Sequence, residues 1–201
     1  HWFHYVGDIG NAGPDRGKGG KYLLLPPDYK GEVPEGYFVL RSQTYQNSYF
    51  WRGFIKDGST ATAVANTKKF AKVYPLANVD NPPPMKFIDV SGKFFNTIGG
   101  NDFSFFEDIN EIVQAEPNEA YSAEILGMLA AIGIEKGKTF APDEKLKKTL
   151  TEAVAVGNAT ARTIAFKPQM KEAYLAPGSS WFFTFVGGSY QFLSQPGVRN
   201  L

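Results

Sequence analysis

The amino-acid sequence predicts an α+β protein in which β-sandwich or jelly-roll-like strands flank a three-helix middle segment. The first ninety residues contain short runs rich in aromatic and β-branched residues, each bounded by Gly, Pro, Asn or Asp. After Gly99 and Gly100 the apolar residues recur at helical spacing, and Trp181–Val186 is again typical of a strand. This order predicts a β domain over 1–90, a helical segment over 91–173 and the start of a second β domain over 174–201.

Five strands are expected in the first domain: Lys21–Leu25, Gly36–Ser42, Tyr49–Ile55, Lys69–Leu76 and Met85–Val90. Gly36–Ser42 is apolar on both faces, which indicates a strand between two layers. The proline runs at 26–27 and 82–84 end their neighbours, because proline cannot sit in a central strand.

Three helices are expected in the middle segment. The first is capped by Asn101 or Asp102, and the second covers about Asn118–Ile132 with Gly133 directly after it. The third begins at Pro142-Asp143 and ends near Phe166, with an apolar stripe made of Leu146, Leu150, Val154, Gly157, Ala161 and Ile164. Glycine inside a helix costs about 1 kcal/mol relative to alanine. We therefore expect a second backbone to pack closely against Gly157.

Composition excludes several classes of protein. The chain has 201 residues and a net charge of +1, which argues against a nucleic-acid partner, because such binding needs a concentrated basic surface. No apolar run reaches the roughly 18 residues of a membrane span. The absence of cysteine rules out disulfides, thiolate nucleophiles and cysteine-bound metals. The N-terminus has neither Met nor a signal peptide, so we expect the chain to begin inside a longer or processed product.

The glycine-rich stretch at residues 13–29, GPDRGKGGKYLLLPPDY, resembles a phosphate-binding loop in composition only. A Walker loop needs glycine where Ala12 stands and Ser or Thr where Gly19 stands, and the segment that follows is a strand. Gly137-Lys138-Thr139 fails similarly, because Ile132 occupies the first glycine position. A dinucleotide fingerprint would need glycine at Tyr22. We therefore expect a β connection and no nucleotide cofactor.

Catalytic and metal-binding residues are not evident. The only histidines, His1 and His4, would point to opposite faces of a strand, so no metal site is expected. No Gly-x-Ser-x-Gly motif is present to supply a serine nucleophile. The carboxylates nearest the transition from strands to helices are weak candidates for an acid/base pair, and Asp102 is better explained as a helix cap: Asp89, Asp102, Glu107 and Asp108.

The sequence is rich in aromatic residues, and this is its strongest hint of a binding surface. Those concerned are interleaved with Arg41 and Arg52: Tyr22, Tyr37, Tyr45, Tyr49, Phe50, Trp51 and Trp181. Such side chains suit sugar stacking or protein contact. The alternative, which we favour, is that they form the core between two sheets. The ligand-contacting surface that we predict is the glycine-rich connection, with Asp15, Arg16, Lys18, Lys21 and Tyr22.

Several segments in order resemble the paired bacterial domain-of-unknown-function families 1254 and 1214. They are VGDIGNAGPDRGKGGKYLLLPPDYKGEVPEGYFVLRSQTY, YPL, FNTIGGNDFSFFEDINEIVQAEP, LAAIGIEKGKTFAPDEKLKKTLTEAVAVGNATAR and FVGGSYQFL. The resemblance implies a signal peptide, a β domain, a helical middle and a second, jelly-roll-like domain, and hence a periplasmic or secreted protein. It also implies that residues 1–90 are the second half of the first domain and that residues 174–201 are the truncated start of the second. It supplies no catalytic residues.

Three functions remain open. The first is an exported bacterial protein that binds a carbohydrate or other envelope ligand, self-assembles as a homo-oligomer, or does both. The second is a carbohydrate- or ester-active enzyme that uses carboxylates or Tyr, Arg and Lys groups in a β cleft. The third is a purely structural jelly-roll oligomer, for which a large symmetric interface would speak.

Overall fold

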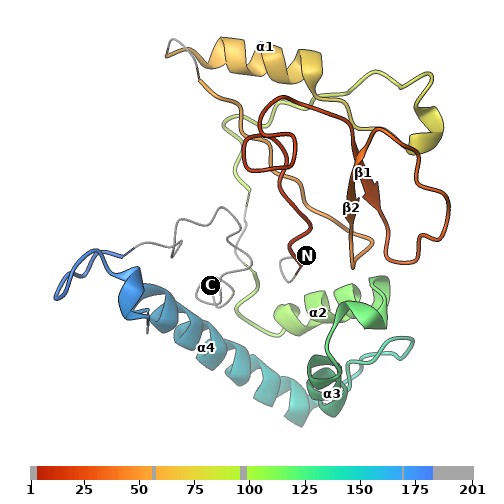
Figure 1. The fold of residues 1–201 in the computed structure, drawn as a ribbon. Coiled ribbons are helices and arrows are strands. Elements are labelled where there is room, and N and C mark those ends of the chain that lie inside the picture. The colour runs from red at the N-terminus through yellow and green to blue at the C-terminus, as the bar shows by residue number, and fades with distance from the viewer. Residues whose placement is uncertain (1–3, 56–57, 96–98, 169, 183–201) are drawn as a thin grey trace. The chain divides into compact units, whose positions relative to one another are not determined.

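The computed structural model describes residues 4–55, 58–95, 99–168 and 170–182. The chain divides into two compact units, of which unit 1 comprises His1–Asn47 with Ile98–Leu201 and unit 2 comprises Ser48–Thr97. Both helices and strands are present, so the mixed class predicted from the sequence is confirmed (Figure 1). The sheet in the described residues is smaller than expected: it consists of two strands.

The sheet of unit 1 pairs β1 (Tyr22–Leu25) with β2 (Phe38–Arg41) in parallel, with Tyr22 opposite Phe38. Both strands were predicted, each with slightly wider bounds. A parallel pair needs a crossover of about a dozen residues, and residues 26–37 supply it. Leu23 and Leu25 alternate with the exposed Leu24, so β1 buries one face.

The helices of unit 1 follow the sequence pattern. They are α2 (Ser104–Ala115), the 3₁₀ turn η2 (Asn118–Ala120), α3 (Ala123–Ala131) and α4 (Glu144–Phe166), with a further turn, η3, at Lys171–Ala173. The second predicted helix is divided into η2 and α3, because the Ser122 side chain caps α3 by accepting from the Ile125 amide. Asp143 caps α4 in the same way, through the Leu146 amide at 2.7 Å. Gly133 has a φ of 88° directly after α3, as predicted for a helix end.

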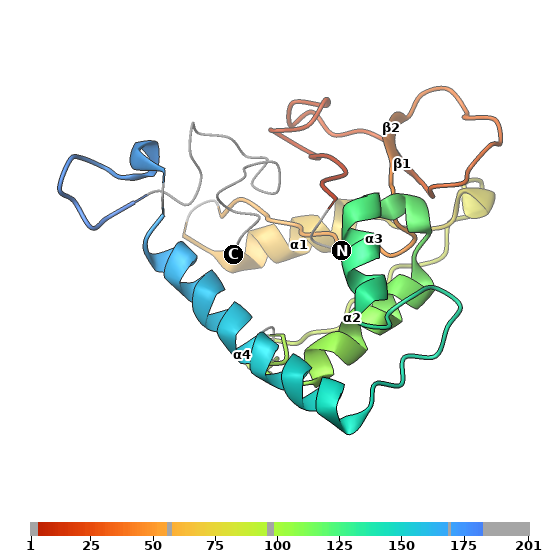
Figure 2. The same ribbon diagram turned by 90° about the horizontal axis from the view of Figure 1, so that it is seen from below.

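Helix α4 is a single unbroken helix (Figure 2), and Leu150 and Val154 are buried among those of its side chains that the structure describes. Phe103 and Phe140, which precede α2 and α4 respectively, stack at 5.8 Å between ring centroids. The expectation for Gly157 is wrong. This residue is exposed, and a Cβ added to it would meet no described atom within 4 Å. Its place in the stripe is therefore not explained by close packing.

Unit 2 differs most from the sequence prediction. It contains α1 (Thr60–Phe70) and the 3₁₀ turn η1 (Leu76–Asn78), whereas strands were expected at Tyr49–Ile55, Lys69–Leu76 and Met85–Val90. These three strand predictions are wrong for the described residues. Ser59 caps α1 by accepting from the Ala61 amide, and the alanine-rich segment that follows favours helix. The segments Tyr49–Ile55 and Met85–Val90 have no partner strand among the described residues, and an isolated strand leaves its backbone groups unpaired.

Among the described residues, buried side chains occur in unit 1 alone. Its buried apolar side chains are Leu23, Leu25, Val113, Ala120, Ile134, Leu150, Val154 and Ala173, and no described residue of unit 2 is buried. Near the C-terminus, Tyr174 and Phe182 form an isolated antiparallel bridge. The rest of the predicted strand Trp181–Val186 lies outside the described residues. Within the part of the chain that the structure describes, no helix is both long and apolar enough to cross a membrane.

Candidate functional site

The glycine-rich loop before β1 is organised around the buried carboxylate of Asp15. Its two oxygens accept hydrogen bonds from the amides of Gly10 at 2.7 Å and Gly19 at 2.9 Å, and from the Tyr22 hydroxyl. The Tyr22 bond, followed by those two amides, lowers the pKa of Asp15, while burial opposes this shift. Burial and the Asp15 bond raise the pKa of the Tyr22 hydroxyl. Asp15 and Tyr22 therefore form one hydrogen-bonded unit that shapes the loop.

The predicted cationic residues of the same loop are exposed. Arg16 adopts a φ of 50°, in the left-handed region that non-glycine residues seldom occupy, and it is followed by Gly17 with a φ of 76°. Lys18 is also exposed, and the Lys21 ammonium lies 5.8 Å from the ring centroid of Tyr37. In the structure, Asp15 is therefore hydrogen-bonded to Tyr22, and the Lys21 ammonium lies over the ring of Tyr37. The role of these five residues in ligand binding stays a prediction.

A second polar centre is formed by Glu116, directly after α2. Its side chain is 0% exposed, and its two carboxylate oxygens accept from the amides of Tyr45 at 2.6 Å and Gln46 at 3.0 Å. The segment that it holds follows β2 and is itself cross-linked. Thr44 donates its amide to the Ser42 hydroxyl at 3.1 Å and its hydroxyl to the Gln46 carbonyl at 3.0 Å. Glu116 thus anchors a turn of the first half of unit 1 to the helical half.

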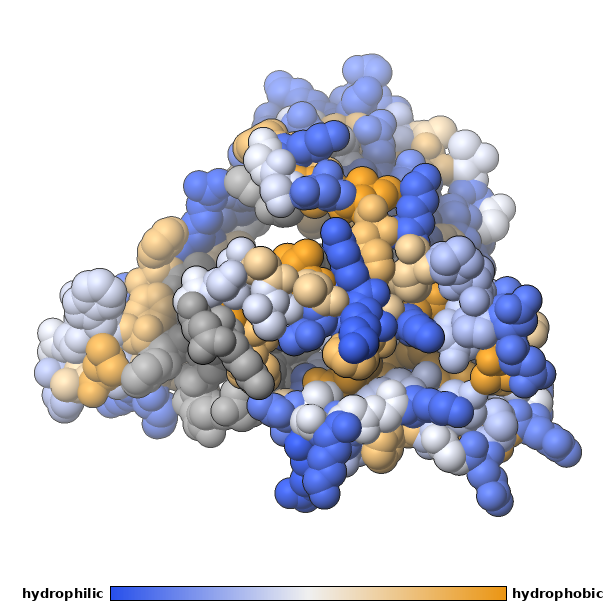
Figure 3. All heavy atoms as spheres, turned by 90° about the horizontal axis from the view of Figure 1, so that it is seen from above, coloured by the Kyte–Doolittle hydropathy of each residue, from blue (hydrophilic) through white to orange (hydrophobic). Residues whose placement is uncertain are grey.

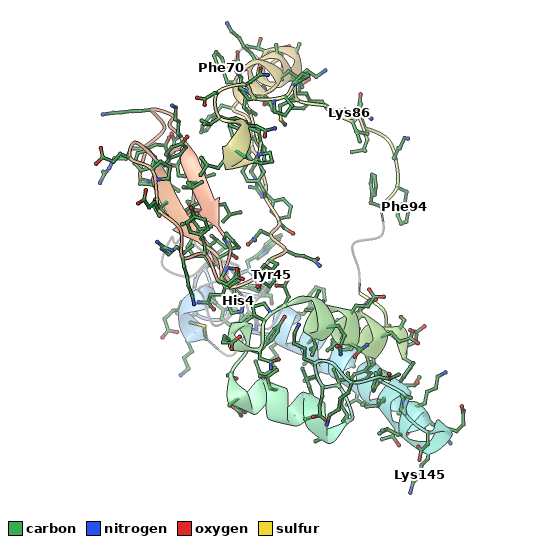
Figure 4. All side chains as sticks on the ribbon, turned by 90° about the vertical axis from the view of Figure 1, so that its right-hand side faces the viewer. His4, Tyr45, Phe70, Lys86, Phe94 and Lys145 are labelled. Atoms are coloured by element: carbon green, nitrogen blue, oxygen red, sulfur yellow. The ribbon has the colours of Figure 1, made fainter. Side chains whose placement is uncertain are left out.

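The charge of this carboxylate acts on two tyrosines, Tyr45 and Tyr121, and His4 lies close to Tyr45 (Figure 4). The pKa of Tyr45 is raised by burial and then by the hydrogen-bonded Asp28, with a smaller effect of the Glu116 charge. Burial, and after it Glu116, also raises the pKa of Tyr121, whose hydroxyl has no hydrogen-bond partner among the described residues. His4 donates from Nε2 to the Ala120 carbonyl at 2.5 Å, and its ring centroid lies 6.4 Å from that of Tyr121.

The loop after α3 is clamped to the end of α2. The Lys136 ammonium donates to the carbonyls of Gln114 at 2.7 Å and Glu116 at 2.8 Å, which compensates the negative end of the helix. The Gln114 side chain in turn accepts from the Gly137 amide at 2.7 Å and donates to the Glu135 carbonyl at 2.9 Å. The Gly137-Lys138-Thr139 sequence is therefore part of a structural connection between α3 and α4.

The aromatic surplus is distributed differently from our prediction. Tyr22 and Tyr37 are half-buried, whereas the other five residues of the set are exposed: Tyr45, Tyr49, Phe50, Trp51 and Trp181. The preference for a core between two sheets is wrong for these five. Tyr49 and Trp51 pack edge to face, with centroids 6.1 Å apart and an angle of 61° between the rings. Hydrophobic side chains, coloured orange, are visible on the molecular surface among polar ones (Figure 3).

The candidate acid/base carboxylates do not form a visible pair. Asp102 accepts from the Ser104 hydroxyl at 2.6 Å and its amide at 2.9 Å, and these bonds lower its pKa. It therefore lies just before α2, but the N-cap residue of this helix is Phe103 and no side chain caps it, so the prediction of Asn101 or Asp102 as the cap is wrong. Glu107 and Asp108 are exposed neighbours on α2, and Asp89 belongs to unit 2. Among the described residues, no group of three His, Cys, Asp or Glu side chains is placed to hold a metal ion. His1 lies outside them.

Comparison with known proteins adds one family. The family model described as "Protein of unknown function (DUF1254)" matches residues 1–75, which include the glycine-rich loop, the sheet and the Tyr49–Trp51 pair. No curated protein matches the chain. The part of the resemblance that concerns family 1254 is therefore supported over these residues.

Sequence reasoning missed the role of Glu116, although a signal was present. In the sequence, Glu116 follows Phe106, Ile109 and Val113 at helical spacing, and Val113 is buried. A carboxylate among core positions predicts a buried acceptor that needs donors. The identity of these donors, two amides about 70 residues earlier in the chain, could not be read from the sequence.

Proposed function

We propose that the protein binds a carbohydrate or another polyhydroxylated envelope ligand through the exposed aromatic side chains of residues 49–54. The observation that carries this proposal is the pair of Tyr49 and Trp51, which pack against each other while remaining 54% and 47% exposed. Aromatic rings with one free face and a polar tip suit the mixed apolar and hydroxylated surface of a sugar.

Neighbouring side chains extend the same surface. Arg52 is exposed and offers planar N–H donors to ligand hydroxyl or carboxyl groups. Phe50 and Phe54 are exposed as well, so four aromatic rings lie within six residues. A row of aromatic groups with one cationic side chain favours a neutral or acidic oligosaccharide over a small apolar ligand.

The cellular setting is proposed from the family resemblance. Export to the periplasm or the medium would place the protein among envelope polysaccharides. We infer by the same resemblance that residues 174–201 begin a jelly-roll-like domain of family 1214 and that the strands of the first domain belong to a larger sandwich.

Titration of the purified chain with envelope oligosaccharides tests the proposal. With peptidoglycan fragments and neutral glucans as probes, we expect Trp51→Ala to weaken binding at least tenfold in isothermal calorimetry. Trp181→Ala is the matched control, because Trp181 is 77% exposed and belongs to unit 1. Equal affinities for both variants would contradict an aromatic site at Trp51.

The same titration tests whether the glycine-rich loop contacts the ligand. Arg16→Ala replaces one L residue by another at the same positive φ, so the backbone cost is unchanged and only the side chain is lost. A weaker affinity for acidic fragments, with an unchanged melting temperature, would show that the loop contacts the ligand. Loss of folding without a specific loss of binding would show a structural loop.

Self-association is a second proposed function, favoured by the exposure of unit 2. None of its described residues is buried, and its exposed side chains include Phe54, Phe70, Ile88 and Phe94. Apolar side chains gathered at this density mark an interaction surface in many soluble proteins.

A further inference from the structure

Unit 2 is basic as well as apolar. Its described residues include two aspartates, Asp80 and Asp89, and six cationic side chains, which are Arg52, Lys68, Lys69, Lys72, Lys86 and Lys93. Phe70, Ile88 and Phe94 are exposed in the same unit, and Phe94 is 92% exposed (Figure 4). A partner for this unit must therefore offer negative charge together with apolar groups.

A hollow of about 180 Å³ concentrates both properties. Lys68, Lys72 and Ala71 line it together with Pro82–Pro84, Met85 and Phe87. The Met85 sulfur accepts from the Val73 amide at 3.2 Å, which joins the proline-rich segment to the end of α1. Hydrogen bonds from Ser91 are the main cause of the lowered pKa of Asp89, and the charge of Lys68 lowers it to a smaller extent. Two ammonium groups beside an apolar lining suit a carboxylate neighbouring an aromatic ring. We call these lining residues the basic surface.

The complementary chemistry occurs elsewhere in the same chain. Residues 94–135 contain no Lys or Arg, although they include eight Asp or Glu residues. Helix α2 exposes Glu107, Asp108 and Glu111 together with Phe105. Glu107 and Glu111 are four positions apart on a helix, where like charges repel each other. A cationic partner would remove this repulsion. We call these four residues the acidic surface.

We propose that two copies of the chain pair through these surfaces, with the acidic surface of each copy on the basic surface of the other. This inference rests on the proposed self-association and names its contact surfaces. A second copy supplies both complementary surfaces, so the contact needs no further partner. The acidic surface offers the negative charge and the aromatic ring that the basic surface requires, so the chemistry of the chain favours a second copy.

Charge reversal with rescue tests the pairing. Sedimentation velocity would measure the dimer dissociation constant of the purified chain and of two variants, Glu107→Lys/Glu111→Lys and Lys68→Glu/Lys72→Glu. All four positions are exposed, and circular dichroism checks that each variant folds. We expect each variant alone to dimerise at least tenfold more weakly and an equimolar mixture to recover a dimer. Glu152→Lys, at an exposed position of α4, changes the net charge without touching either surface and serves as the control.

The outcomes separate the two proposals. A dimer that neither reversal weakens would overturn the assignment of these surfaces and leave self-association standing. A monomer at all accessible concentrations would overturn both. Weaker dimerisation of each variant without rescue in the mixture would overturn direct pairing of the two surfaces. Binding of the parent chain to vesicles of anionic phospholipid, lost in the lysine variant alone and without any dimer, would assign unit 2 to a membrane surface instead.

Discussion

The carboxylate of Glu116 accepts a hydrogen bond from the backbone amide of Tyr45 at 2.6 Å, although the two residues are 71 positions apart in the chain. The second oxygen accepts from the next amide, that of Gln46, at 3.0 Å. A single side chain therefore satisfies two consecutive donors of the segment after β2. The contact links the part of unit 1 that precedes unit 2 in the sequence to the part that follows it.

Removal of this carboxylate should destabilise the fold. We expect Glu116→Ala to lower the free energy of unfolding by about 2–3 kcal/mol, because two amides lose an ionised acceptor in a buried setting. Glu116→Gln keeps one acceptor oxygen and should cost less. Urea unfolding measures both changes. Glu119→Ala, at an exposed position three residues away, is the control and should have little effect. Equal stability of the alanine variants would show that the Tyr45 contact contributes nothing.

The Lys136 ammonium should contribute more to the stability of the fold than the nearby Lys138 does. Lys136 donates to carbonyls at the end of α2, whereas Lys138 pairs with Glu135 at 2.7 Å on the surface. We expect Lys136→Ala to cost about 1–2 kcal/mol, since helix-end carbonyls lose a charged donor. Lys138→Ala should cost less than about 0.5 kcal/mol, as surface ion pairs usually do. Thermal melts of the two variants provide the comparison, and the reverse order would contradict this interpretation of the α2 end.

Two glycines in unit 1 should respond in opposite ways to alanine. Gly157 is exposed in the interior of α4 with space around it, so Gly157→Ala should stabilise the protein by up to about 1 kcal/mol. Gly133 has a φ of 88°, which an L residue adopts only with strain, so Gly133→Ala should destabilise it by about 1 kcal/mol. Chemical denaturation measures both variants. A destabilised Gly157→Ala variant would restore the close-packing interpretation that the structure contradicts.

Stability should depend on acid through Asp15. Its pKa is lowered in the folded state, chiefly by the Tyr22 hydroxyl and then by the Gly10 and Gly19 amides. A group with a lowered native pKa stabilises the fold above its unfolded pKa of about 3.9 and loses that contribution as the pH falls through the native value. We therefore expect the melting temperature to fall below about pH 5.

Two variants isolate this contribution. Asp15→Asn should remove the part of the acid-side decrease that Asp15 causes, and Tyr22→Phe should reduce it, because the largest cause of the shift is lost. Melting curves from pH 3 to pH 7 measure the decrease. An unchanged pH profile in Asp15→Asn would show that the Asp15 charge does not stabilise the loop.

Local sequence signals predicted most of the helical structure of unit 1. Asp143 stands where α4 begins, Gly133 follows the end of α3, and the apolar positions of α4 repeat with helical spacing. Both signals act within a few residues, because a helix satisfies its own backbone hydrogen bonds. The same local logic identified β1 and β2.

Strands and sites depend on partners that are distant in the chain. The segments Tyr49–Ile55 and Met85–Val90 have the composition of strands, but a strand exists only where another backbone pairs with it. Whether Tyr49 and Trp51 are core or surface depended in the same way on what packs against them. The donors to Glu116 are likewise supplied by a turn far away in sequence. Composition and spacing thus predicted the helices of unit 1 in outline, whereas only tertiary contacts decided which carboxylates are buried and which aromatic rings face solvent.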